Sequence, residues 1–529
     1  MPDHIQSFIK GREMQVLNVS FGGVNWVVLI VYLLGIILLG YYFSRRASKN
    51  LDEYFRGGKR VPGWAAGVSI WATTLSSITF MAIPAKAFTD NWLFAFDNYT
   101  IVLITPFIII FFLPFFRKLN ITSAYEYLEA RFDLAIRLIG SLGFCFFHIF
   151  RIAIVIYLPT LAITSVTNLN PYMIVILIGF LCVLYTCIGG MEGVVWSDTI
   201  QGIILLLGAV ISIGVAIYNI DGGFSAVFTT AAEHGKFIPK GAWDWSFINA
   251  TIPVIVLGGL FNNLYQYVGS QDVVQRYNTT PTARLAAKAL KTNAIFSCFD
   301  PIIFYGFGTV LFVFYTQHSN LLPANFNPSG IVPYFIVTQL PAGIAGLAVA
   351  AIFAAAQSTV SSSLNSIAAC WTVDIKQRLF HNKDEHKLVN SSKIVILVIG
   401  SLSTLMCIYM VSSNQTALLD LFRTLLGMLG APIAGIFILG IFTRRANAAG
   451  ALTGLIATLF ILIFIKFTGF DLYFNGIFAI GGTVGIGYLT SLFFASKKVT
   501  DKGLTIFGLK QIRIDLAAEI IPKVFLHKK

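Results

Sequence analysis

Residues 62–85 read PGWAAGVSIWATTLSSITFMAIPA, which has the length of a membrane span but not the composition of a simple lipid-facing helix. Hydroxyl side chains recur along the run, and Pro84 stands near its end. A second run, residues 251–277, reads TIPVIVLGGLFNNLYQYVGSQDVVQRY and mixes glycines with amides in the same way. Backbone groups freed by a helix break are tolerated at membrane depth only inside protein or beside a cavity. Both runs are therefore predicted to be broken helices that mark the binding site of a transporter.

The rest of the chain has the composition of a polytopic membrane protein. Of its 529 residues, 56% are apolar and 12% are charged, whereas soluble domains are about 25% charged. A membrane-spanning helix needs about 20 predominantly apolar residues, and about 13 runs meet that length. They are residues 24–43, 62–85, 95–116, 134–166, 171–188, 194–219, 251–270, 290–316, 333–372, 393–412, 416–442, 447–468 and 473–495, the run 333–372 spanning from about Gly343 onward.

The order of these runs predicts an all-α polytopic membrane protein with a repeated core. The two broken runs stand five spans apart, which is the spacing of two five-helix inverted repeats. One span then precedes the core and two follow it. The expected parts are an external N-terminus (1–23), an extra helix (24–44), the first repeat (62–219), the second repeat (251–442), two C-terminal helices (447–495) and a basic tail (496–529).

The formal net charge of +13 is spread over many short loops rather than gathered on one face, which argues against nucleic acid as a partner. With alternating spans and an external N-terminus, 29 of the 37 Lys and Arg residues fall in internal loops and the tail, including the stretch 276–291. Basic residues concentrate on the cytoplasmic side of membrane proteins. The N-terminus is thus predicted outside and the C-terminus inside. The basic tail either lies on the inner leaflet of the bilayer or is solvated.

Residues 351–366, AIFAAAQSTVSSSLNS, place hydroxyl groups on one face of a helix. Ser358, Ser361, Ser362 and Asn365 recur at the spacing of one helix face, with Thr359 beside them. Such a stripe is also typical of small-residue packing between membrane helices. Hydroxyls and freed carbonyls are suitable ligands for Na⁺, so the hydroxyls of Ser358 and Thr359 are predicted to combine with carbonyls near Ala72 and Leu75.

Among the charged residues within the predicted spans, Asp198 and Arg151 are the candidates for a functional role. An ionisable residue in a membrane span indicates a functional site by default. Asp198 is expected to neutralise a second Na⁺ or a proton near Ser361 and Ser362, or else to be an interfacial carboxylate. Arg151 lies near the centre of 134–166 and needs an anion: Asp198, a substrate carboxylate gripped by two hydrogen bonds, or a purely structural partner.

Motifs of enzymes and ATPases do not occur in the sequence. There is no Walker lysine motif, no HExxH and no GxSxG. We therefore expect a transporter rather than an enzyme, with an ion gradient as its energy source.

Four stretches resemble the sodium–solute symporter family, which includes bacterial sialic acid, proline and sugar transporters. They are DEYFRGGKRVPGWAAGVSIWATTLSSITFM (52–81), GGMEGVVWSDTIQG (189–202), SQDVVQRY (270–277) and AAIFAAAQSTVSSSLNS (350–366). With the hydropathy pattern, the resemblance covers about residues 24–495. The stretches TTLSSITFM, ITSAYEYLEARFD and FHIFRIAI are most similar to the sialic acid branch. The resemblance implies about 13 transmembrane helices with a LeuT-type core of five plus five helices.

The resemblance also implies roles for individual residues. Arg151 matches the arginine that binds the substrate carboxylate in the sialic acid branch, and Asn98 stands where that branch has glutamine. The other implied substrate-binding residues are Thr74, Ser76, Thr79, Phe94 and Asn263. The first Na⁺ site maps to Ala72, Leu75, Ala355, Ser358 and Thr359, where threonine replaces the usual serine. A second Na⁺ site maps to Asp198, Ser358, Ser361 and Ser362.

The expected function is Na⁺-driven import of sialic acid (N-acetylneuraminate) by alternating access, in a bacterial-type inner membrane and as a monomer. Another carboxylate-bearing solute such as proline, or a neutral sugar, is the alternative cargo. A neutral sugar would leave Arg151 without an anion. A membrane sensor or a channel is the alternative from another class, and no signalling domain is recognised after residue 495.

Overall fold

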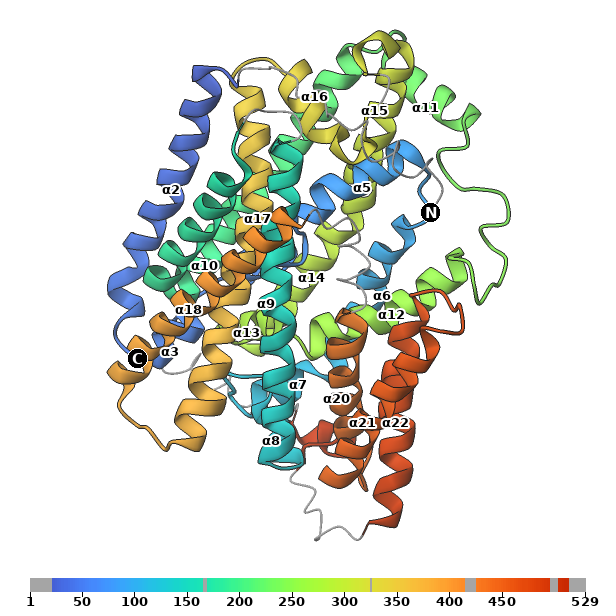
Figure 1. Ribbon diagram of the computed structural model, residues 1–529. Helices are drawn as coiled ribbons and strands as arrows, with labels where there is room; N and C mark the ends of the chain where they lie inside the picture. The colour runs from blue at the N-terminus through green and yellow to red at the C-terminus, as the bar shows by residue number, and fades with distance from the viewer. Residues whose placement is uncertain (1–20, 165–168, 324–325, 414–424, 495–502, 513–529) are drawn as a thin grey trace, which may run out of the picture.

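The computed structural model describes residues 21–164, 169–323, 326–413, 425–494 and 503–512. These residues form a bundle of helices without a strand (Figure 1). The helices of the first half are α2 (Gly23–Ala47), α3 (Leu51–Arg56), α4 (Gly63–Thr74), α5 (Ser77–Thr89), α6 (Ala95–Phe111), α7 (Leu113–Lys118), α8 (Glu126–Arg131), α9 (Leu134–Thr164), α10 (Pro171–Tyr218) and α11 (Gly223–Glu233).

The second half continues the bundle with the same all-helical character. Its helices are α12 (Ile252–Val268), α13 (Gln271–Asn278), α14 (Ala283–Asp300), α15 (Gly306–Gln317), α16 (Ile331–Gln339), α17 (Ile344–Ala369), α18 (Glu385–Ser412), α20 (Ala431–Phe442), α21 (Ala448–Ile465) and α22 (Phe474–Phe493). Short π-helical segments join or extend several of them, at Pro301–Tyr305, Cys370–Gln377 and Leu426–Gly430.

Both predicted broken helices are broken in the structure. α4 and α5 meet at an angle of 59° across a break at Leu75 and Ser76. Leu75 has an extended backbone, and the Ser76 hydroxyl accepts a hydrogen bond from the amide of Ile78 at 3.2 Å, which starts α5. α12 and α13 are separated by Gly269 and Ser270. Each break therefore leaves helix ends inside the bundle.

By length and apolar composition, eight of the described helical segments can cross a membrane, and the bent pair α4–α5 is a ninth. The shorter apolar segments Ala95–Phe111 and Leu426–Phe442 account for two more of the predicted runs. The runs 171–188 and 194–219 are one 48-residue helix, α10, which turns at Gly190. Gly190 has a φ of 57°, and a Cβ there would lie 2.9 Å from the Cβ of Ala47, so only glycine fits this turn.

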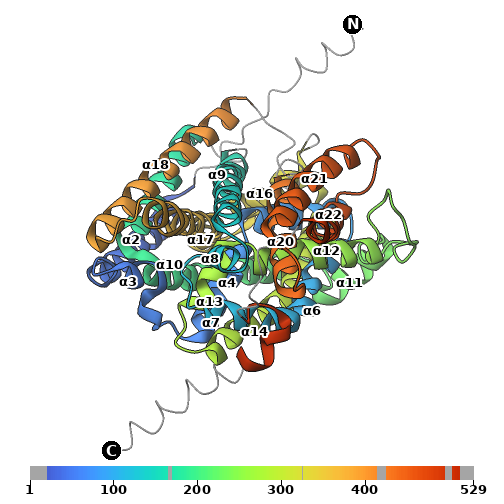
Figure 2. The same cartoon turned by 90° about the horizontal axis from the view of Figure 1, so that it is seen from below.

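α17 forms the centre of the bundle. It lies behind α9 and α18 in Figure 1 and between α2 and α9 in Figure 2. Within its apolar stretch, α17 is 89% buried inside the protein, compared with 28% for α2 and 22% for α18. The small residues that line α17 allow the neighbouring helices to approach closely. α20, α21 and α22 form a separate group on the opposite side from α2 (Figures 1 and 2).

Short helices occur in the connections between the long ones. α17 begins at Ile344, close to the predicted Gly343, and the segment between the two repeats contains the short helix α11. Between α7 and α9, the short helix α8 covers Glu126–Arg131. The predicted N-terminus 1–23, the start of the run 416–442 and most of the tail 496–529 lie outside the described residues.

Candidate functional site

The break between α4 and α5 faces the hydroxyl stripe of α17. The Ser358 hydroxyl donates to the carbonyls of Ala72 at 3.0 Å and Ala355 at 3.3 Å. The Thr359 hydroxyl donates to the carbonyls of Thr73 at 3.2 Å and Ala355 at 3.4 Å. All of these groups are buried. The predicted first Na⁺ site therefore brings Ala72, Ala355, Ser358 and Thr359 together, with Leu75 two residues beyond Thr73 at the helix end.

The chemistry of this first cluster suits a hard monovalent cation. Its atoms are neutral hydroxyl and carbonyl oxygens, and the C-terminal end of α4 adds partial negative charge. Unwound carbonyls and half-helix ends of this kind coordinate Na⁺ in transporters. The residues present therefore fit the ion that the sequence predicts.

Asp198 of α10 is the centre of a second polar cluster. Its partners on α17, Ser361 and Ser362, lie about one turn beyond Ser358. Its side chain is fully buried within the protein. Its carboxylate accepts from Ser361 at 3.4 Å and Ser362 at 3.2 Å, and from two hydroxyls of α4, Ser69 at 2.7 Å and Thr73 at 3.3 Å. The predicted residues of the second Na⁺ site thus lie together, with Ser361 also donating to the Ser358 carbonyl at 3.2 Å.

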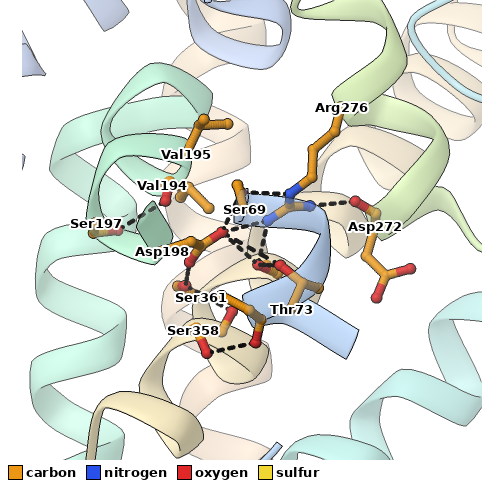
Figure 3. Close-up of polar contacts among 12 residues, drawn as sticks. Ser69, Thr73, Val194, Val195, Ser197, Asp198, Asp272, Arg276, Ser358 and Ser361 are labelled. Atoms are coloured by element: carbon orange, nitrogen blue, oxygen red, sulfur yellow. Dashed lines mark hydrogen bonds and ion pairs between the residues drawn. The ribbon is translucent and has the colours of Figure 1, made fainter. Parts of the chain in front are cut away.

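The cation that contacts Asp198 in the structure is Arg276 of α13. Its Nη2 lies 2.6 Å from Asp198 Oδ2, and its Nε donates to the Ser69 hydroxyl at 2.7 Å. Figure 3 shows the guanidinium reaching from α13 between the α4 and α10 side chains. The positive-inside count placed Arg276 in an internal loop, whereas the structure places it in the helix α13 with its side chain fully buried.

Arg151 of α9 does not pair with Asp198. Its Nη1 lies 2.9 Å from Oδ2 of Asp272, and its Nη2 donates to the Thr73 carbonyl at 3.2 Å. The Ser270 hydroxyl donates to the other oxygen of Asp272 at 2.5 Å. Arg151 is only 4% exposed. A guanidinium therefore lies beside the α4 break, next to the predicted substrate-binding residue Thr74.

The remaining predicted substrate-binding residues are distributed over the four helices α4, α5, α6 and α12. Ser76 is buried, whereas the other five side chains are half-buried: Thr74, Thr79, Phe94, Asn98 and Asn263. The Thr74 hydroxyl bonds to its own helix at Trp71 O, 2.9 Å away. Asn263 of α12 donates to the Thr100 hydroxyl of α6 at 2.8 Å. The half-buried residues other than Thr74 and Asn263 are Thr79 on α5, Phe94 at the start of α6 and Asn98 within α6.

Phe94 directly precedes the first residue of α6. Its ring stacks on Tyr473 with the centroids 6.2 Å apart. A cavity of about 470 Å³ lies elsewhere, and none of the predicted site residues lines it. It is bounded by Phe442, Thr443, Arg444, Arg445, Val484, Gly485, Tyr488 and Phe507.

Sequence reasoning did not identify Asp272 and Arg276 as site residues. Both occur in SQDVVQRY, and their i, i+4 spacing within an apolar run was the available signal. Their partners, Arg151 and Asp198, are 121 and 78 residues away in the sequence. No local pattern reports such long-range pairs.

Comparison with known proteins assigns this arrangement to a family. The model of the Sodium:solute symporter family matches residues 54–458, which include every predicted site residue. The chain belongs to the sodium:solute symporter family. The chain is accordingly a membrane transporter of multi-spanning type and not an enzyme.

Two relatives in the sodium:solute symporter family are similar over nearly their whole length. The chain is 48% identical over 482 residues to the sodium/sialic acid symporter SiaT of Proteus mirabilis, covering 90% of this chain and 97% of the relative. It is 46% identical over 484 residues to the sodium/sialic acid symporter NanT of Aliivibrio fischeri, covering 91% and 96%.

Solved structures agree with the fold of this family member. A Na⁺-coupled sialic acid symporter, solved in a substrate-bound outward-open state, superposes with a TM-score of 0.86 at 47% identity, covering 90% of this chain and 99% of that one. Mhp1, a nucleobase-cation-symport-1 family transporter in a closed conformation, superposes with a TM-score of 0.55 at 16% identity, covering 86% and 98%. The second likeness concerns the fold alone.

Proposed function

We propose that this chain is a Na⁺-coupled symporter that imports sialic acid, with N-acetylneuraminate as its substrate. The observation that carries the proposal is the buried guanidinium of Arg151 beside the break of α4. A guanidinium donates two parallel hydrogen bonds to a carboxylate, which selects an anionic solute. Two relatives with 46% and 48% sequence identity are named sodium/sialic acid symporters, which supports the choice of sialic acid and Na⁺.

In this proposal the substrate lies against α4, α6 and α12. Arg151 binds its carboxylate, and the hydroxyls and amides of the surrounding helices contact the rest of the sugar. Phe94 covers its outer side. Those hydroxyls and amides belong to Thr74, Ser76, Thr79, Asn98 and Asn263.

The coupling ions bind to the two oxygen clusters. One Na⁺ is held by the carbonyls of Ala72, Leu75 and Ala355 with the hydroxyls of Ser358 and Thr359. A second Na⁺ is held by Asp198 with Ser358, Ser361 and Ser362. Both sites join α17 to other helices, so Na⁺ stabilises one arrangement of the two repeats, residues 62–219 and 251–442. Rocking of these repeats then exposes the substrate inside.

The proposal includes a location and an assembly. The chain lies in the inner membrane of a bacterial cell, its apolar helices contact the lipid bilayer, its N-terminus is outside and its C-terminus inside. One copy contains a complete set of site residues, so the monomer is the transporting unit.

The test is uptake of labelled N-acetylneuraminate into proteoliposomes that contain the full chain. An inward Na⁺ gradient is expected to drive accumulation, whereas equal Na⁺ on both sides or choline in its place is not. Uptake that ignores the Na⁺ gradient would contradict the coupling. Excess unlabelled proline and a neutral sugar are the competitors that test the cargo, because proline also carries a carboxylate that Arg151 would fit.

A further inference from the structure

Four buried charged side chains form a continuous chain between the two predicted binding regions. Arg151 contacts Asp272 at 2.9 Å, and Arg276 contacts Asp198 at 2.6 Å. Asp272 and Arg276 are linked through the backbone, because Arg276 Nη1 donates to the carbonyl oxygen of Asp272 (Figure 3). All four side chains are at most 5% exposed. The chain begins at the predicted carboxylate-binding arginine and ends at the predicted ligand of the second Na⁺.

The two middle residues are positioned to exchange partners. Asp272 and Arg276 stand four residues apart on α13, and side chains at this spacing lie on the same helix face. The guanidinium already contacts the Asp272 backbone carbonyl, whereas the Asp272 carboxylate points away from it in Figure 3, so an exchange requires new rotamers of both side chains. Thr73 connects the two ion pairs, because its carbonyl accepts a hydrogen bond from Arg151 and its hydroxyl donates one to Asp198.

We propose that Asp272 and Arg276 are coupling residues that transmit Na⁺ binding to the substrate site by this exchange of ion-pair partners. Na⁺ at Asp198 displaces Arg276, which then pairs with Asp272. Asp272 releases Arg151, and the guanidinium becomes available to the sialic acid carboxylate. The same exchange runs in reverse when substrate binds first, as reciprocal coupling requires. This inference rests on the proposed function and adds a mechanism to it.

Electrostatics favours binding of both ligands over binding of either one alone. The four side chains carry two positive and two negative charges, which sum to zero. Na⁺ alone would leave the buried group with a positive charge, and the substrate carboxylate alone with a negative charge. An uncompensated charge in a buried region is strongly unfavourable. Both ligands together restore neutrality, so each strengthens the binding of the other.

The experiment measures the Kd of N-acetylneuraminate by titration calorimetry on the purified full chain, in NaCl and in choline chloride. In the wild type, Na⁺ is expected to tighten binding. Asp272→Asn removes the anion that holds Arg151. Asp198→Asn leaves Arg276 to pair with Asp272, which again releases Arg151. Both variants are expected to bind N-acetylneuraminate about fivefold or more tightly than the wild type in choline, within the usual range of coupling between sites.

Tyr277→Phe is the matched control on α13. It removes a buried hydrogen bond to the Tyr267 carbonyl, 3.0 Å long, without changing a charge, and should keep the wild-type Kd in both buffers. If a folded Asp272→Asn or Asp198→Asn protein binds N-acetylneuraminate in choline as the wild type does, or more weakly, the proposed exchange of ion-pair partners (the relay) is overturned. Failure of both variants to fold while Tyr277→Phe folds would assign the ion pairs to structure and also overturn it.

The wild-type data separate this inference from the proposed function. If the wild type shows Na⁺-dependent binding but the variants keep the wild-type Kd in choline, the relay is contradicted and the symporter proposal still stands. A wild type that binds no N-acetylneuraminate in either buffer would contradict the proposed function, and the relay with it.

Discussion

At the scale of single residues, the main feature is that each buried guanidinium near the α4 break has a carboxylate partner. Arg151 pairs with Asp272, and Arg276 with Asp198. A buried ion pair is weak evidence for stability, because desolvation offsets much of the attraction. Two such pairs beside a break in a helix are better explained by binding of charged ligands than by a need to stabilise the fold.

Arg151→Lys tests the carboxylate-binding role. Lysine keeps the charge but lacks the planar fork, so at least one charged hydrogen bond to the substrate is lost. Such a bond contributes about 1.5–3 kcal/mol, and N-acetylneuraminate binding should weaken about tenfold to 150-fold in NaCl, measured by calorimetry. Arg137→Lys is the control on the same helix, since Arg137 pairs with Glu129 and Asp374 away from the break. Unchanged affinity in Arg151→Lys would mean that Arg151 is structural.

At the scale of elements, α5 and α15 are held unusually close together. A Cβ on Gly308 of α15 would lie 2.1 Å from the Pro84 carbonyl oxygen and 2.8 Å from the Ala87 Cβ of α5. Only a residue without a side chain permits this approach of two backbones. α5, the second half of the first broken helix, is thereby fixed against α15.

Gly308→Ala is expected to destabilise the protein, because overpacking of a close contact costs about 1–3 kcal/mol. Gly306→Ala is the matched control on α15, since a Cβ there meets no atom within 4 Å and its φ is helical. Alanine at that position should leave the Tm unchanged or raise it slightly. Thermal unfolding of both variants in detergent checks the difference. Equal Tm values for the two would show that α15 moves away from α5 without cost.

The segment α3 and the loop after it are tied to α10 by charges on one face of the bundle. Arg60 Nη2 lies 2.5 Å from Glu53 and 3.1 Å from Glu192. The hydrogen bond from Arg60 holds the pKa of Glu53 below its ordinary value of 4.5, against the opposing effect of partial burial. The contact anchors the connection that leads into α4.

This lowered pKa predicts a pH dependence of stability. The unfolded chain binds a proton more readily than the folded one, so the stabilisation is complete above pH 4.5 and is lost as the pH falls through the lowered pKa. The Tm of the wild type should therefore fall more steeply between about pH 5 and pH 3 than that of Glu53→Gln, which should be lower at pH 7. Parallel Tm curves for the two proteins would show that Glu53 does not contribute.

At the scale of the whole molecule, the distribution of Lys and Arg predicts which ends of the helices face the cytoplasm. The structure shows that two of the basic residues counted as internal, Arg276 and Arg131, are buried. Arg276 is buried in an ion pair. Arg131 is buried near the ends of α20, where it donates to the carbonyls of Gly440, Thr443 and Ala446. Among the described basic residues, Arg45 and Arg46 lie in the last turn of α2, and Arg444 and Arg445 lie in the loop after α20.

The orientation is tested by two single cysteine substitutions at exposed positions. Asn249→Cys lies in the segment between the repeats, and His386→Cys lies at the start of α18. A membrane-impermeant maleimide is expected to label the first in intact cells and the second only after permeabilisation. The wild type reports background labelling, since all six native cysteines are free and buried or half-buried. The reverse pattern would contradict an external N-terminus.

The sequence by itself determined the membrane class, the two broken helices, the hydroxyl stripe of α17 and the position of Arg151 and Asp198 within apolar spans. These features follow from hydropathy, from helix periodicity and from the high free energy of polar groups in hydrocarbon, all of which act locally along the chain. The family resemblance added the expected substrate. Gly190 and Gly308 illustrate the limit of local reasoning, because their need for glycine comes from atoms of other helices.

Only the tertiary structure decided which charges meet. Sequence order made Asp198 the nearest acid to Arg151, but the helices bring Asp272 to Arg151 and Arg276 to Asp198. A buried charge pairs with the opposite charge that packing places within a few ångströms, whatever their separation in sequence. The broken helices at 62–85 and 251–277 could be read from their composition, but the pairing of Asp272 with Arg151 and of Arg276 with Asp198 required the folded molecule.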